Sequence, residues 1–330
     1  MGKQKLFLVL ILGSASVFYI VFSGSPGFRM NAPIYPAQGV EQSTVCGSAR
    51  GRHTPSTIFF ITPTYPRREQ IAELTRLGQT LLLADDLHWI VAEDSLTCSP
   101  LVADLLARLG IPFTHIASPQ PDVYKESKFN PRGVSSRRAG LSWVLSNFNE
   151  GIIYFADDDN TYDIRLFKEI SRTRKISMFP VGFIGGQGVS SPIVLDGVVV
   201  GFSDDWFAQR KFPVDMAGFA VNIDFIRSRN PRADLSMPYK AGYEEDYFIR
   251  SLKPRLTEIE PLADNCSLVL VWHTQTKKES ASILYLKTTE EKTNLDSLLS
   301  FLHYSGMAVK GKHGKPVKSC YDGHQCKTNS

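Results

Sequence analysis

The stretch IIYFADDD, residues 152–159, decides the expected fold, because an apolar run passes directly into three consecutive aspartates. A run this short, rich in β-branched and aromatic residues, is typical of a strand buried on both faces. The carboxylates of Asp157, Asp158 and Asp159 therefore stand at the carboxyl end of a buried strand. In an α/β sheet this is the edge at which ligands bind.

Three adjacent carboxylates are costly unless something neutralises them, and a divalent cation is the usual solution. Oxygen ligands alone favour Mg²⁺ or Mn²⁺ over zinc. The triplet therefore predicts a metal-dependent site for a nucleotide-sugar. The alternative is an acidic turn that caps the next helix, expected at residues 164–170.

Strands and helices alternate along the chain before the triplet. This order predicts a parallel sheet with helices on both sides. Polar residues also follow two other strands, at 62–65 and 93–94, so these side chains and the triplet should line one crevice. The expected strands are 58–61, 87–92, 112–116 and 151–156, and the expected helices are 67–83, 101–109 and 133–147.

The alternation of strands and helices becomes less regular after residue 162. The part of the chain that follows is expected to build the acceptor side of the crevice. Beyond residue 277 the chain is polar, which leaves open a peripheral helix, a dimerisation arm or a largely disordered tail. The later elements are expected as strands at 181–188, 194–202 and 268–272, a loop and strand at 212–221, and a helix at 243–252.

The N-terminus carries an uncharged apolar segment, residues 6–22, that follows Lys3 and Lys5. It is interpreted as a membrane anchor whose basic residues 1–5 stay in the cytosol, with a cleaved signal peptide as the alternative. Both interpretations place the remainder in the secretory lumen. Residues 23–55 are rich in Ser, Gly, Pro and Ala, which predicts a flexible stem.

The chain has five cysteines, and the lumen permits disulfides. Since five is odd, at least one is free or pairs between chains. Cys46 is the natural candidate for an interchain bond, whereas Cys320 and Cys326 can close a small loop. A net charge of +4 gives no argument for nucleic acid.

Several side chains near the expected strand ends suit a nucleotide. Tyr65 can stack on a base, and Asp94 can accept a hydrogen bond from a base or ribose. Arg132 and Arg137 straddle a helix start and offer paired donors to phosphate or carboxylate. The alternative for both arginines is a solvated helix end.

A second acidic cluster, residues 244–246, lies on the expected helix 243–252. One member can act as the general base that a sugar hydroxyl needs in order to attack. The alternative is an acidic first turn favoured by the helix dipole. His273 follows an apolar strand, where it either binds a phosphate or metal or is a half-buried structural histidine.

These residues belong to longer blocks that resemble the β-1,3-glucuronyltransferases of glycosyltransferase family 43. The resemblance keeps its order from about residue 57 to 276. It implies a GT-A fold with a UDP-sugar-binding half, residues 56–160, and an acceptor-binding half, residues 161–276, followed by a tail, residues 277–330. The blocks are TPTY (62–65), WIVAED (89–94), YFADDDNTY (154–162), FPVDMAGFA (212–220) and VWHT (271–274).

The resemblance also implies the chemistry and setting. The expected activity is Mn²⁺-dependent, inverting transfer of glucuronate from UDP-glucuronate to the 3-hydroxyl of a terminal galactose on a proteoglycan linker, glycoprotein or glycolipid. The expected protein is a single-pass type II Golgi membrane protein and a homodimer. Carried over by position, Glu245 is the catalytic base and Asp159 the metal ligand. The expected sugar-donor residues are Thr64, Tyr65, Asp94, Arg132, Arg137, Asp157, Asp158, Lys240 and His273, and the expected acceptor residues are Ser190, Trp206, Arg210 and Asp215.

Two positions depart from the family pattern. Ser190 stands where members acting on the proteoglycan linker carry a glutamate that helps to hold the acceptor galactose. Gln275 replaces an arginine near the UDP. Two alternatives therefore stay open: a different donor such as UDP-xylose, and an inactive paralogue that binds glycans or organises a complex.

Overall fold

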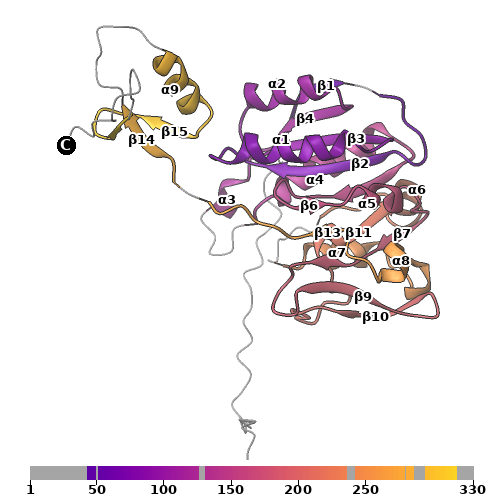
Figure 1. Ribbon diagram of the computed structural model, residues 1–330. Coiled ribbons are helices and arrows are strands. Elements are labelled where there is room, and N and C mark those ends of the chain that lie inside the picture. Colours follow the sequence, from indigo (N-terminus) through magenta and orange to yellow (C-terminus); the bar gives the residue numbers. More distant parts are fainter. Residues whose placement is uncertain are drawn as a thin grey trace, which may run out of the picture. The chain divides into compact units, whose positions relative to one another are not determined.

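The computed structural model describes residues 43–49, 51–125, 131–235, 242–278, 280–285 and 294–317 (Figure 1). The expected cytosolic tail, the apolar segment 6–22, Lys240, Cys320 and Cys326 lie outside these residues. Within the described ranges, no helix combines the length and apolarity that crossing a membrane requires.

An eight-stranded mixed sheet carries the site. Its order is β1-β4-β3-β2-β5-β11-β7-β12, and the four neighbours from β4 to β5 run parallel. These four are the strands expected before the triplet, so the predicted parallel sheet is confirmed for them. β1 and β11 extend the sheet and are antiparallel to their neighbours. The strands are β1 (Thr44–Ala49), β2 (Ile58–Thr64), β3 (Leu87–Glu93), β4 (Phe113–Ala117), β5 (Ile152–Phe155), β7 (Ile176–Met178), β11 (Phe219–Asn222) and β12 (Ile259–Pro261).

Helices cover both faces of this sheet, as the sequence predicts (Figure 1). Alternate residues of a strand point to opposite faces, so Phe60 packs with α1 (Gln70–Leu81) and α2 (Pro100–Leu109), whereas Phe59 and Ile61 pack with α4 (Val134–Asn147). The predicted α/β class is therefore confirmed. Shorter helices are α3 (Asp122–Lys125), α5 (Arg165–Ile170), α6 (Ile223–Arg229) and α7 (Glu244–Ser251).

A second, five-stranded sheet has the order β10-β9-β8-β13-β6. The single strand expected at 194–202 is instead a hairpin, because Asp196 and Gly197 turn the chain with φ of 50° and 75°. Val271 of β13 pairs with Tyr162 of β6, which brings His273 close to the end of β5. The strands are β6 (Thr161–Tyr162), β8 (Val181–Gly182), β9 (Val189–Leu195), β10 (Val198–Ser203) and β13 (Val271–Trp272).

Several short elements complete the described chain. α8 (Leu262–Cys266) is a left-handed turn, since Ala263, Asp264, Asn265 and Cys266 have φ between 52° and 60°. The region beyond residue 277 contains helix α9 (Asn294–Tyr304) and a small sheet of β14 (Ser282–Tyr285), β15 (Ala308–Lys310) and β16 (Lys315–Pro316). Two 3₁₀ turns are η1 (Met216–Gly218) and η2 (Leu256–Glu258).

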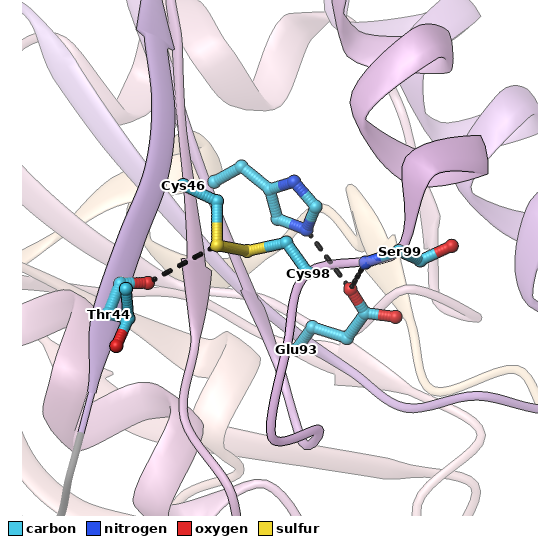
Figure 2. Close-up of a disulfide and its surroundings, with 6 residues drawn as sticks. Thr44, Cys46, Glu93, Cys98 and Ser99 are labelled. Carbon is cyan, nitrogen blue, oxygen red and sulfur yellow. Dashed lines mark hydrogen bonds and ion pairs between the residues drawn. A yellow bond between two sulfur atoms is a disulfide. The ribbon is translucent and has the colours of Figure 1, made fainter.

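Cys46 forms an intrachain disulfide with Cys98 (Figure 2). The expectation of an interchain bond at Cys46 is therefore wrong. The reason is β1, which lies within the predicted stem yet pairs with β4 and so brings Cys46 beside the loop that follows β3. The stem boundary expected at residue 55 is thus too late for residues 44–49. Among the described cysteines, Cys266 is free.

Candidate functional site

A cleft of about 630 Å³ opens at the carboxyl ends of β2, β3 and β5. The starts of α4 and α7 and the segments before η1 and after β13 form its other walls. It brings together most of the predicted site residues: Thr64, Tyr65, Asp94, Arg132, Arg137, Asp157, Asp158, Asp159, Asp215, Glu245 and His273.

Gly133 allows the start of α4 to approach this edge of the sheet. Its φ is 75°, and a Cβ there would lie 2.8 Å from Arg137 Nη1 and 3.1 Å from Pro63 Cβ. A larger residue would therefore be strained and would push α4 from β2. The glycine lets Arg132 and Arg137 line the cleft.

The three aspartates of the triplet have different partners. Asp157 forms an ion pair with Arg137. Asp158 Oδ2 accepts from Thr64 Oγ1 at 2.7 Å and lies 2.8 Å from Arg67 Nη2. Burial nevertheless raises the pKa of Asp158 to about 6.

The carboxylate of Asp159 has no hydrogen-bond partner among the described residues. Its backbone oxygen accepts from Thr274 Oγ1 at 2.6 Å and from Arg76 Nη2 at 3.3 Å. The triplet thus offers one side chain that is not already bonded.

The helix-capping alternative for the triplet does not hold. β6 separates the triplet from α5, and Asp163 Oδ1 accepts the Arg165 backbone N–H at 2.9 Å. Asp163 therefore bonds the first turn of that helix, whose N-cap residue is Ile164.

The chemistry at Asp159 fits a divalent cation. Burial raises the pKa of this carboxyl, and Asp157 and Glu73 add to the effect, so a bound cation would relieve an unfavourable concentration of negative charge. In the described part of the chain, no three His, Cys, Asp or Glu side chains converge as a metal site. A cation held by one carboxylate and by oxygens of a bound diphosphate needs no such cluster.

The part of the cleft around Tyr65 and Asp94 suits a nucleoside. The Tyr65 ring has the Arg67 guanidinium 4.5 Å and Lys278 Nζ 5.5 Å from its centre. Asp94 Oδ1 accepts the Gln120 N–H at 2.7 Å, and the Asp94 N–H donates to the Thr64 carbonyl at 2.8 Å. Asp94 is therefore fixed by backbone contacts.

Glu245 is the member of the acidic cluster that suits a general base. Its Oε2 is buried and has no partner within the described ranges. Burial, reinforced by Glu244 and Asp215 and opposed by Arg137, raises the pKa of Glu245 to about 8. Asp246 is excluded as the base, because it is fully buried and accepts the Lys211 and Phe212 N–H groups, each at 2.8 Å.

Asp215 and His273 face each other across the cleft floor. His273 Nδ1 lies 3.6 Å from Asp215 Oδ2. Burial raises the pKa of Asp215, and His273 opposes that shift. Gln275 Nε2 lies 3.2 Å from His273 Nε2, so the glutamine that replaces the expected arginine contacts a residue of the site.

Three predicted acceptor residues do not line the cleft. Ser190 is buried in β9, and its Oγ has no partner in the described structure. Arg210 pairs with Asp204 at 2.9 Å and stacks over Trp206, with 4.7 Å from the guanidinium to the ring centre. Trp206 lies against Gly242, a cleft-lining residue at which a Cβ would be 2.6 Å from the indole.

Some cleft residues were missed by sequence reasoning. Lys278 is the most informative, because the resemblance ends at residue 276 and a lysine in a polar tail carries no distinguishing pattern. It adds a cation to the cleft, near the Tyr65 ring. The other missed lining residues are Gln120, Gly133, Val134, Met216 and Gly242.

The model of glycosyltransferase family 43 matches residues 77–277. The chain belongs to this family. Among its relatives, galactosylgalactosylxylosylprotein 3-beta-glucuronosyltransferases S and P of Drosophila melanogaster are 51% and 49% identical over 76% and 74% of this chain. The alignments span 61% and 51% of those relatives' own lengths.

The family 43 chain also resembles a human relative, galactosylgalactosylxylosylprotein 3-beta-glucuronosyltransferase 2, with 43% identity over 73% of this chain and 74% of that protein. Among solved structures, the crystal structure of S. aureus TarS 1-349 matches this chain with a TM-score of 0.45 and 14% sequence identity. The match covers 66% of this chain and 60% of the TarS chain.

Proposed function

We propose that this family 43 protein transfers glucuronate from UDP-glucuronate to the 3-hydroxyl of a terminal galactose, with inversion at the anomeric carbon. The observation that carries the proposal is one cleft in which a buried, unpaired carboxylate oxygen of Glu245 and the unbonded carboxylate of Asp159 lie with arginine and histidine side chains. Relatives named as 3-beta-glucuronosyltransferases support the choice of sugar.

The sugar donor would lie along the strand ends. Tyr65 stacks on the uracil, and the oxygen of Asp94 that Gln120 does not bond accepts from the base or ribose. Arg132, Arg137 and His273 bind the diphosphate and the glucuronate carboxylate, for which arginine offers paired donors. Asp157 and Asp158 contact the ribose and the donor sugar. Lys240 adds a basic group near the diphosphate.

Asp159 would hold Mn²⁺, which when bound supplies positive charge to the departing diphosphate. On the acceptor side, Asp215 lines the cleft, and Trp206, Arg210 and Ser190 are proposed to contact the acceptor or shape its site. The Ser190 hydroxyl is buried and has no hydrogen-bond partner among the described residues.

The reaction is a single displacement. The galactose 3-hydroxyl oxygen attacks the anomeric carbon as its proton passes to the Glu245 carboxylate. The bond from the anomeric carbon to the phosphate oxygen breaks, and UDP leaves with the electron pair. The raised pKa of Glu245 makes it a stronger base, and the cationic side chains of the cleft stabilise the charge that builds on UDP.

We also propose a single-pass type II protein of the Golgi membrane that works as a homodimer, with residues 6–22 as the anchor. The intrachain disulfide supports an oxidising compartment.

The test uses protein comprising residues 43–330, so that Cys46 is retained. It is incubated with UDP-glucuronate, Mn²⁺ and a panel of galactosides, with UDP-xylose as a competing donor. We expect UDP release and a β-linked product on acceptors that end in galactose. If no acceptor elicits transfer or UDP release, or if UDP-xylose is used in preference, the proposal is wrong.

A further inference from the structure

A buried carboxylate, Glu93, lies behind the wall of the cleft and takes no part in the proposed reaction. It is fully buried at the end of β3, and its side chain does not line the cleft. Oε2 accepts the Ser99 N–H at 2.9 Å and lies 3.1 Å from His115 Nε2, and Oε1 accepts from Gln70 Nε2 at 3.2 Å. Because of these hydrogen bonds, the pKa of Glu93 is lowered despite burial.

The contacts of Glu93 lead to the cleft through α1. Gln70 Nε2, which donates to Glu93, also lies 3.3 Å from Thr64 Oγ1. That hydroxyl donates to Asp158 Oδ2 at 2.7 Å. A continuous hydrogen-bonded path thus runs from a buried charge to two residues that line the cleft.

The same carboxylate closes the loop that begins with Asp94. Glu93 reaches past residues 94–98 to hold the Ser99 N–H, and the adjacent Cys98 is bound to Cys46 of β1 (Figure 2). At the start of the loop, the Asp94 N–H donates to the Thr64 carbonyl. Hydrogen bonds therefore hold both ends of the loop that carries Asp94. The middle of the loop is exposed, since Leu96 is 82% accessible to solvent.

We propose that Glu93 is a positioning residue that holds Asp94 and Thr64 in place for the nucleoside diphosphate, and that Gln70 transmits its effect to Thr64. The proposal rests on the proposed function, which places a UDP-sugar in this cleft. The two carboxylate oxygens of Glu93 bond three groups, on Gln70, Ser99 and His115. A glutamine at position 93 has only one acceptor oxygen, so one of these buried donors would lose its partner.

The experiment compares Glu93→Gln and Gln70→Ala with the wild-type full chain. Gln79→Ala is the matched control, because Gln79 is an exposed residue of the same helix. UDP binding is measured by calorimetry with Mn²⁺ present, kcat and KM for the sugar donor are measured separately, and the melting temperature is recorded. We expect a roughly tenfold weaker Kd for UDP, equal to ~1.4 kcal/mol, with KM raised in parallel and kcat unchanged in both variants.

The two variants should also be non-additive, because they break one path. The hydrogen-bonded path is supported if the Kd of the double variant for UDP is no larger than the larger of the two single-variant Kd values. A purely structural role would lower the active fraction, so kcat would fall while KM stayed the same. That result, or an unchanged Kd in both variants, overturns the positioning role alone. A wild-type protein that does not bind UDP overturns the proposed function.

Discussion

The rate of transfer should rise with pH and reach half of its plateau near pH 8, because the proposed base, whose pKa is about 8, must be ionised before it can accept a proton. Burial and the neighbouring Glu244 raise the pKa of Glu245 to about 8 from the ordinary 4.5. With this pKa, about 3% of Glu245 is ionised at about pH 6.5 and about 24% at about pH 7.5. We therefore expect kcat/KM to rise by about eightfold over that one unit, whereas a base with an ordinary pKa would give a flat profile.

Replacing Glu244 by glutamine tests the cause of the shift. It removes the like charge beside Glu245, so the midpoint of the profile should move to lower pH. The assay is kcat/KM from UDP release between about pH 5.5 and 9, at saturating Mn²⁺ and low acceptor concentration.

Two further variants complete the test. Glu245→Gln should abolish turnover at every pH while UDP still binds, and Glu150→Gln, at an exposed carboxylate, should follow the wild-type profile. A wild-type profile that is flat between about pH 6 and 8.5 would refute the assignment of Glu245 as the buried base. A Glu244→Gln midpoint equal to that of the wild type would refute the stated cause.

Three other changes test separate parts of the structure. Asp159→Asn should remove the dependence of UDP binding on Mn²⁺, measured by calorimetry; a variant that still responds to Mn²⁺ contradicts the metal assignment. Cys46→Ser opens a disulfide that spans 52 residues, so the free energy of unfolding, measured by chemical denaturation, should fall by about 4 kcal/mol. An unchanged denaturation midpoint contradicts the intrachain pairing. So does a wild-type dimer on a non-reducing gel that the substitution removes. Lys278→Ala should weaken UDP binding by about fivefold, because a partly exposed charge interaction contributes ~1 kcal/mol, and this effect should shrink at high salt. If the variant and the wild type bind UDP equally well at low salt, Lys278 is not part of the site.

The sequence predicts the donor half of the fold well because its strands are buried on both faces. β2, β3 and β5 are short apolar runs, and their carboxyl ends carry the polar residues that meet in the cleft. Once the alternation of strands and helices indicates an α/β sheet, the position of the site follows from the general rule for such sheets. That rule needs no knowledge of side-chain contacts.

The remaining features depend on contacts that local patterns do not encode. β1 reads TVCGSA, whose small residues give no alternation of apolar and polar side chains, so the sequence predicts stem at these positions. The apolar run 268–272 is a strand at Val271–Trp272, the two residues that pair with β6 and β8. Lys278 reaches the cleft from the expected tail, where nothing in the sequence distinguishes it.

The first strand of the described chain replaces β4 as the edge of the eight-stranded sheet, and an irregularity between Val45 and Gly47 makes that edge a poorer template for pairing. β1 pairs along β4, so the backbone N–H and C=O groups on that side of β4 are occupied. A fragment that begins after residue 49 would leave them open, and an unpaired edge is a template for pairing with another chain. Such a fragment should aggregate during production even if its cleft folds correctly, and the six residues of β1 would then decide whether soluble enzyme is obtained.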